Sequence, residues 1–447
     1  YTLMDRYLLE VNMRADASSR FHKDHRWGYF PSFSAGWRMN EEGFMKDIEW
    51  INNLKIRASY GTLGNINNVG NYDYFQNYSS GNHYNFSDSP VIGIGESKPA
   101  NETLGWEKVA LTDIGLDFDI FNGLLGVTAD YYIKNTSDIL LGYNVPTETG
   151  ITAAPSQNIG KVKNTGFELA LNHRNKIGAV NYSIGANIAT NKNKITNLGG
   201  SDNIIQTSSY IVKYILKKGE SIGSFYGFKT DGLYTQADID AGHYYTLSGV
   251  VPNAGDVKFV PQRDIEYKQE ITDEDRTILG KDVPDFTYGV NLSLQYKGFE
   301  FSMFGQGISG TKVAFDVYGV HPFYHGQDNP RKYHLKRWTE ENPNPYAAYP
   351  RLYSASSVHT TYNRNFSDYH LFDSDYFRFK TLSLGYTVPS ATVKSWGLQS
   401  LKVYVTGENL FTVRADKKME DFDPETAGGV IYTLGTKSVA FGVNISF

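Results

Sequence analysis

The last ten residues of the chain read SVAFGVNISF, from Ser438 to Phe447, and strict alternation is their main feature. Every second residue is apolar: Val439, Phe441, Val443, Ile445 and Phe447. The residues between them are small or polar, so a β-strand here has one apolar face and one polar face. Three settings produce such a strand: the edge of a β-sandwich, a soluble barrel, or a barrel whose apolar face lies in lipid.

The same period-two pattern recurs along the chain and predicts twelve strands. The segments lie near residues 7–14, 33–39, 54–60, 112–120, 125–134, 167–172, 180–188, 288–296, 299–303, 376–388, 401–410 and 437–447. Around Leu382 and Leu384 the alternation slips, which predicts a β-bulge. The fold class that follows is all-β.

The connections between these strands are short and long in turn. The long ones span 15–29, 61–104, 135–165, 190–284, 308–375 and 411–436, and two of the short ones, 40–53 and 389–400, look helical. This rhythm is typical of an antiparallel up-and-down barrel with tight turns at one rim and large loops at the other. Aromatic residues gather at strand ends, as at Trp27, Tyr131 and Phe299, which favours a transmembrane barrel with aromatic girdles over a sandwich.

Composition removes several classes of function. The net charge is −5, so nucleic-acid binding has no electrostatic support. The chain has no cysteine, and His321, His325 and His334 lie among helix-breaking residues without the spacing of a metal site. The sequence contains no run of about 18 apolar residues, so it predicts no membrane-spanning helix. No nucleophile and base can be paired, so the sequence predicts no enzyme, no cofactor and no metal site.

Charged residues fall on the polar face of the predicted strands. The candidates for a water-filled lumen, or for contact with an element that fills it, are Glu10, Arg14, Arg38, Arg57, Asp117, Asp130 and Glu168. Such charges would be prohibitive among apolar side chains. Their mixture of signs suggests pairing with lumen water or with a plugging domain.

Several longer stretches resemble one known family. They include DASSRF (residues 16–21), WGYFPSFSAGWRM (27–39), LKIRASYGTLGN (54–65), NIGKVKNTGFEL (158–169), GESIGSFYGFKTDGLY (219–234), PDFTYGVN (284–291), FRFKTLSLGYTVP (377–389), VYVTGENLFT (403–412) and the terminal Phe447. In this order they resemble the SusC/RagA-like TonB-dependent outer-membrane transporters. Ala17 departs from the family's usual glycine, and the 256–280 loop lacks the Asp-Gly calcium-like pattern of many relatives.

The resemblance implies a plugged barrel of about 22 strands, of which residues 1–447 supply about twelve C-terminal ones. The signal peptide, the plug and the first strands are then expected outside this chain. Family membership implies import of oligosaccharides or peptides across the outer membrane of a Gram-negative bacterium of the Bacteroidota type. It also implies a TonB complex acting through the missing part, a SusD-like surface lipoprotein as a lid, and a dimer of such pairs.

Aromatic and amide residues in the predicted loops are candidates for binding that substrate, since rings stack on sugars and side chains. They are Tyr72, Tyr74, Tyr78, Tyr143, Asn144, Tyr210, Tyr226, Tyr234 and Trp338. For each of them, loop packing or contact with the lipoprotein is the alternative. Phe447 is the candidate barrel-assembly signal, on a strand expected to pair with a first strand outside this chain.

Two other interpretations remain open from the sequence. A complete twelve-stranded barrel would act as a passive channel or a membrane-embedded enzyme, and Tyr1–Arg14 would then pair with the terminal strand. A secreted β-sandwich that binds glycans would instead dissolve without detergent.

Overall fold

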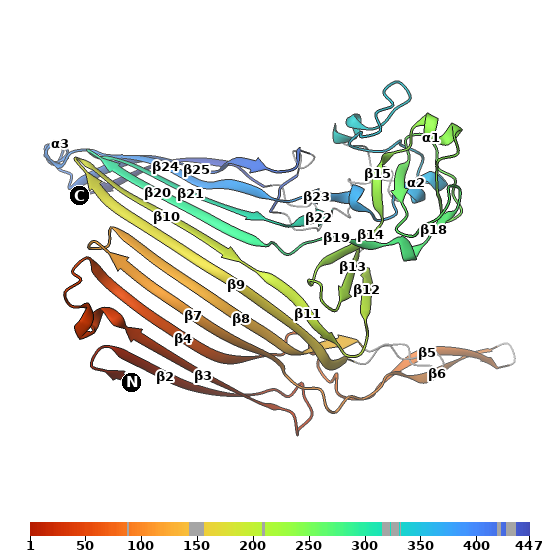
Figure 1. The fold of residues 1–447 in the computed structure, drawn as a ribbon, viewed down its shortest axis with the longest axis horizontal. Coiled ribbons are helices and arrows are strands. Elements are labelled where there is room, and N and C mark those ends of the chain that lie inside the picture. Colours follow the sequence, from red (N-terminus) through yellow and green to blue (C-terminus); the bar gives the residue numbers. More distant parts are fainter. Residues whose placement is uncertain are drawn as a thin grey trace. The chain divides into compact units, whose positions relative to one another are not determined.

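A computed structural model describes residues 1–86, 89–142, 156–207, 211–314, 322, 330, 332–417, 422–425 and 435–447. The chain is mainly β-strand, as predicted (Figure 1). It divides into two compact units. Unit 1 comprises Tyr1–His173, Ala189–Asp202 and Lys217–Glu220, and unit 2 comprises Arg174–Ile188, Asn203–Leu216 and Ser221–Phe447. Among the described residues, no helix has both the length and the apolar composition needed to cross a bilayer.

Unit 1 is built on an antiparallel sheet with the order β1-β2-β3-β4-β7-β8-β9, and β11 also pairs with β9. The strands are β1 (Thr2–Leu3), β2 (Tyr7–Ala17), β3 (Trp27–Arg38), β4 (Ile51–Asn65), β7 (Glu107–Ile120), β8 (Leu125–Gly142), β9 (Ser156–Ile177, in this unit through His173) and β11 (Lys192–Leu198). A separate hairpin is formed by β5 (Asn77–Phe86) and β6 (Ser89–Lys98). All the strands predicted for this part of the chain are confirmed, and most extend beyond their predicted ends.

The register in unit 1 gives the sheet two chemically distinct faces. One row across the ladders places Leu9, Ala35, Ala58, Ile114, Tyr131 and Phe167 opposite one another. The adjacent row on the other face places Gly36, Arg57, Gly115, Asp130 and Glu168 opposite one another. The apolar row is not covered by protein, since the exposed fractions of Ile114 and Phe167 are 56% and 43%. A sheet with this much exposed apolar surface calls for a non-aqueous environment or a partner on that face.

Unit 2 contains antiparallel neighbouring strands in the order β10-β20-β21-β24-β25-β26. The strands are β10 (Val180–Thr190, in this unit through Ile188), β20 (Phe286–Tyr296), β21 (Phe299–Ser309), β24 (Tyr376–Thr387), β25 (Ser400–Arg414) and β26 (Ser438–Ser446). The apolar row of β26 continues across the sheet, because Phe441 lies opposite Val405, which lies opposite Leu384. The exposed fraction of Phe441 is 84%, as expected for a side chain that faces lipid.

Local backbone features agree with the sequence pattern in most places. The predicted slip in β24 is a bulge between Phe379 and Thr381, seen in the ladders with both neighbouring strands. Lys297 and Gly298 both have positive φ, as the tight turn between β20 and β21 requires. The helical segment predicted at 389–400 is α3 (Ser390–Lys394).

The segment 40–53 was expected to be helical, and this is only partly right. It contains two 3₁₀ turns, η1 (Met39–Glu41) and η2 (Gly43–Met45), and β4 already begins at Ile51. The single glycine of this stretch, Gly43, disfavours a continuous α-helix, and what remains is too short to be stable by itself.

The predicted long loops 190–284 and 308–375 contain a folded module within unit 2, which alternation did not reveal (Figure 1). Its strands are β12 (Asn203–Thr207), β13 (Lys213–Lys217), β14 (Ser224–Gly227), β15 (Lys229–Leu233), β16 (Thr246–Leu247), β17 (Val257–Val260), β18 (Glu270–Ile271), β19 (Thr277–Lys281), β22 (Lys312–Ala314) and β23 (Leu371–Asp373). Its helical turns are α1 (Gln236–Asp240), η4 (Asp273–Asp275), η6 (Lys332–Lys336), α2 (Val358–Asn363) and η7 (Asp368–His370).

This folded module, which we call the outer module, has its own hydrophobic core, which includes Phe228, Val257, Phe259, Ile271 and Tyr362, all at most 1% exposed. Its strands are too short for a period of two to be visible in the sequence. These predicted loops are therefore structured by packing between residues more than a hundred positions apart.

Candidate functional site

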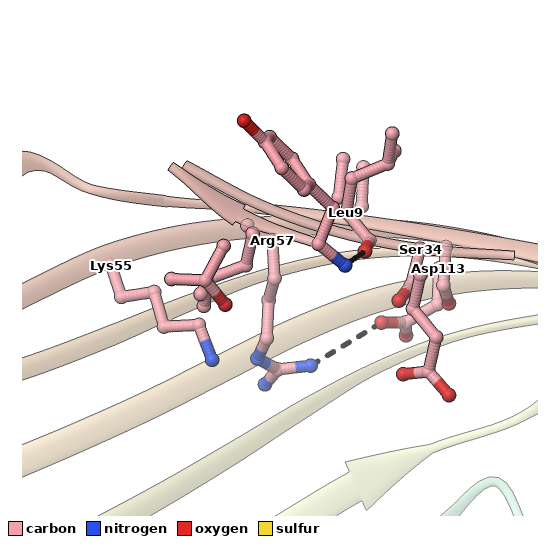
Figure 2. A pocket seen from close by; sticks show the side chains of 13 residues that line it. Leu9, Ser34, Lys55, Arg57 and Asp113 are labelled. Atoms are coloured by element: carbon pink, nitrogen blue, oxygen red, sulfur yellow. Dashed lines mark hydrogen bonds and ion pairs between the residues drawn. The ribbon is translucent and has the colours of Figure 1, made fainter. Parts of the chain in front are cut away.

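The polar face of unit 1 carries one cation surrounded by three carboxylates. Arg57 of β4 donates from Nε to Asp117 Oδ2 at 3.2 Å and from Nη2 to Asp130 Oδ2 at 2.8 Å. Its Nη1 lies 3.4 Å from Asp113 Oδ1, the contact drawn in Figure 2. The Arg57 side chain is 30% exposed, so this network is only partly screened by solvent. The guanidinium thus joins β4, β7 and β8 on one face.

A glycine makes this reach possible. Gly115 lies directly opposite Arg57 in the ladder, and a Cβ atom there would stand 2.4 Å from both Arg57 Cζ and Asp130 Oδ1. Any larger residue would push the guanidinium away from β8. The pattern Asp-x-Gly-x-Asp at 113–117, opposite an arginine, is therefore the sequence signal for this network.

A cavity of about 500 Å³ lies beside this network. Its lining includes Glu10, Ser34, Lys55, Arg57 and Asp113, all from β2, β3, β4 and β7 (Figure 2). Arg57 and its three aspartates carry a net charge of −2 (one positive and three negative charges). An aqueous wall with such a charge attracts cations or a basic protein segment.

The predicted lumen-facing charges form several separate groups. Arg57, Asp117 and Asp130 come together, and Glu168 stands opposite Asp130 on β9. The remaining three make local contacts: Glu10 accepts from Asn12, Arg14 pairs with Asp16 at 2.6 Å, and Arg38 pairs with Glu41 at 3.1 Å. That these charges contact a plugging domain stays a prediction.

A second charged network, in unit 2, was missed in the sequence. Arg378, 5% exposed, contacts Asp423 at 2.6 Å and Glu425 at 2.7 Å, and Lys380 contacts the same Glu425 oxygen at 2.6 Å. Burial opposes ionisation of Asp423, but its bonds from Arg378 outweigh this and lower the pKa of its carboxyl below the usual value. The network fastens the segment 423–425 to the polar face of β24. The only advance signal was the pairing of a basic strand, FRFK, with an acidic loop, DFDPE.

Three of the predicted ligand-binding residues are covered by the protein itself. The exposed fractions of Tyr74, Tyr234 and Trp338 are 8%, 0% and 5%, and Tyr74 and Trp338 each belong to a hydrophobic core cluster. For Tyr234 the tertiary role is specific, because its hydroxyl accepts from Tyr245 N at 3.2 Å and burial raises the pKa of the phenol to about 12. The loop-packing alternative therefore holds for these three.

The other candidates divide into accessible residues and undescribed ones. Tyr72 and Tyr78 are 66% and 65% exposed, and Tyr226 of β14 is half-buried. Tyr143, Asn144 and Tyr210 lie outside the described residues. Substrate binding at Tyr72, Tyr78 and Tyr226 stays a prediction.

The acidic loop near residue 273 is held by internal hydrogen bonds. Asp275, 0% exposed, accepts from the backbone N–H groups of Gln262, Arg263 and Thr272 and from the Arg263 side chain. No group of three or more His, Cys, Asp or Glu suited to a metal occurs in the described ranges.

A family model, described as TonB dependent receptor-like, beta-barrel, matches residues 1–410. The chain belongs to this family. The predicted fold class and the predicted family are both confirmed. Family membership excludes the alternative of a secreted β-sandwich that binds glycans. It also explains why apolar rows such as that of Ile114 and Phe167 are exposed.

Named relatives support the SusC-type assignment. TonB-dependent receptor P3 of Formosa agariphila is 32% identical over 418 residues, which is 92% of this chain and 40% of that protein. TonB-dependent receptor SusC of Bacteroides thetaiotaomicron is 28% identical over 458 residues, which covers all of this chain and 42% of that protein. A structure of the RagAB peptide transporter matches with a TM-score of 0.77 and 25% identity, over 99% of this chain and 46% of the other.

This TonB-dependent barrel chain spans less than half the length of these relatives. In the described residues the ladders of β2 are with β1 and β3, and the ladder of β26 is with β25. A barrel closed at twelve strands therefore gains no support from the ladders that are present. The assembly role of Phe447 stays a prediction.

Proposed function

We propose that the chain is the C-terminal barrel portion of a SusC-type transporter, which imports oligosaccharides or peptides across the outer membrane. The observation that carries the proposal is the family match on strands with two opposite faces. One face is apolar and uncovered, and the other is polar and ion-paired around Arg57. Lipid on the first face and an aqueous or protein-filled interior on the second satisfy both sets of side chains.

In this proposal, the energy for import and the capture of the substrate come from parts outside this chain. The plug, the remaining strands and the segment that contacts a TonB complex belong to the rest of a longer protein, since the relatives are more than twice as long. A SusD-like surface lipoprotein covers the outer module, as the likeness to SusC and to the RagAB peptide transporter suggests. The named relatives are receptors and transporters, which supports transport and not catalysis as the activity.

The test is an uptake experiment with the full-length protein in a Gram-negative host. Cells with and without a functional TonB complex receive a defined mixture of short peptides and neutral oligosaccharides, and mass spectrometry follows depletion of each component. We expect depletion of one class, only with TonB present. Equal depletion in both strains would indicate a passive channel, and no depletion of either class above that of cells lacking the protein would refute import of these substrates.

A further inference from the structure

A second cavity, of about 490 Å³, lies wholly within unit 2, where strands β21 and β24 meet the outer module. Its apolar walls include Phe225 of β14 and Tyr376 of β24, while Lys312, Ser374 and Asp282 supply polar groups. The size falls within the range of about 300–1,000 Å³ that is usual for sites of small organic ligands. Apolar walls with a few convergent polar groups are also typical of such sites.

Two polar groups in this cavity have no partner in the described part of the chain. The ammonium of Lys312 makes neither a hydrogen bond nor an ion pair there, although its stem is held against Gly280, whose missing Cβ leaves room for it. Ser374 is 4% exposed, and its backbone N–H donates to Thr311, but its hydroxyl makes no hydrogen bond with described residues. The Lys312 ammonium and the Ser374 hydroxyl are therefore open to water in this cavity, and a ligand can replace that water.

Among the described residues no neighbouring acid forms an ion pair with Lys312, and Asp368 acts on it only by charge attraction at longer range. The Glu425 carboxylate is already occupied, because it accepts from Tyr376 at 3.0 Å and from Gln306 at 3.3 Å and pairs with Arg378 at 2.7 Å and Lys380 at 2.6 Å. Asp282 stands at the exposed side of the cavity, where its carboxyl accepts a hydrogen bond from Tyr214 and has no ion pair among the described residues. A ligand is therefore offered one cation without an ion pair and one hydroxyl inside, with a hydrogen-bonded carboxyl at the rim.

We propose that this cavity binds the C-terminal residue of a peptide. The ligand carboxylate pairs with Lys312 and accepts a hydrogen bond from Ser374, while the adjacent side chain packs on Phe225 and Tyr376. A uronic-acid oligosaccharide also carries carboxylates, but its further negative charges would meet Asp282 at the rim and be repelled. That the ligand is a transported substrate rests on the proposed function, and the substrate class is then peptides.

The experiment measures binding by calorimetry to the full-length protein in detergent. The probes are acetyl-Ala-Ala-Phe with a free carboxylate, the same peptide as its C-terminal amide, and trigalacturonate. The variants are Lys312→Gln, Lys312→Arg and Ser374→Ala, with Lys268→Gln as a matched control, because Lys268 is an exposed lysine of unit 2 outside the cavity.

We expect the free acid to bind at least about tenfold more tightly than the amide, and Lys312→Gln to remove that preference, as for a hydrogen-bonded charge pair. Lys312→Arg should retain it, Ser374→Ala should weaken it and Lys268→Gln should leave it unchanged. Equal binding of acid and amide, absence of peptide binding, or a Lys312-dependent preference for trigalacturonate would each overturn the proposal. Because binding is measured without transport, failure of TonB-dependent uptake with intact peptide binding would refute only the proposed function.

Discussion

Replacing Asp275 with asparagine should loosen the loop of residues 257–281 while the strands of the sheets stay folded. Asp275 is fully buried and its two carboxylate oxygens receive five hydrogen bonds, from Gln262, Thr272 and both the backbone and side chain of Arg263. An asparagine keeps one acceptor oxygen and turns an NH₂ group toward donors. The Thr272 N–H and the Arg263 Nη2 would then lose their acceptor.

Hydrogen bonds to a charged group contribute about 1.5–3 kcal/mol each, and neighbouring bonds do not add fully. For two lost bonds and a lost charge we expect a loss of about 3 kcal/mol in the local opening free energy. At 1.4 kcal/mol per factor of ten, this raises the population of the open loop about 100-fold.

The assay is hydrogen exchange followed by mass spectrometry on the full-length protein in detergent, with peptides covering Gln262 and Arg263. Their amides should exchange about 100-fold faster in Asp275→Asn, because protection follows the local opening equilibrium. Glu274→Gln is the control. Its side chain is 76% exposed and contacts Arg263 only as a surface ion pair, which contributes about 0–1 kcal/mol. Equal exchange in the wild type and Asp275→Asn, or equal acceleration by Glu274→Gln, would refute the reasoning.

Three further outcomes are expected. Burial opposes the charge on Asp275, but hydrogen bonds from Arg263 and the backbone prevail and lower the pKa of its carboxyl from 3.8 to about 2. The stabilisation of the loop by this carboxylate is therefore complete above about pH 4 and is lost as the pH falls toward 2. Pepsin should cut the loop increasingly over that interval, and cleavage independent of pH would contradict the assignment. Arg57→Gln should lower the free energy of unfolding of the full-length barrel by about 2 kcal/mol, a value between those typical of surface and of buried ion pairs, and Arg57→Lys should lower it less. The measurement is the midpoint temperature of the heat-modifiable gel shift, and identical midpoints for the wild type and Arg57→Gln would argue against the network. Phe441→Arg should reduce assembly of the barrel in the membrane, because an arginine on the lipid face costs up to about 2–4 kcal/mol. Asn444→Arg, on the other face of β26, should not reduce it, and equal assembly of the two variants would contradict the assignment of the two faces.

The secondary structure of the sheets could be predicted because it depends on neighbours in sequence. Alternation placed β26 and eleven other strands, and even the slip that became the bulge beside Phe379 was visible, although the ten-residue strands β5 and β6 fell in a predicted loop. The candidate site was only half predictable. Arg57, Asp117 and Asp130 were assigned to one face, but their meeting depends on the register of three strands and on the absence of a side chain at Gly115.

The outer module was beyond sequence reasoning for a related reason. Tyr234 and Trp338 looked like exposed loop aromatics, yet both are buried, and Trp338 lies in a core assembled from segments about a hundred residues apart. Short strands carry too few residues for a period to emerge, so burial there is decided by packing alone.

The sequence by itself therefore determined the strands, their two faces and the family to which they belong. In SVAFGVNISF, alternation was enough to assign Phe441 and Val443 to the exposed apolar face, because successive side chains of a strand must point to opposite sides. Only the tertiary structure decided which charges are neutralised and which, like the ammonium of Lys312, are left without an ion pair among the described residues. Charge pairing acts over a few ångströms in space, and residues as far apart as Arg378 and Glu425 reach that distance only in the folded chain.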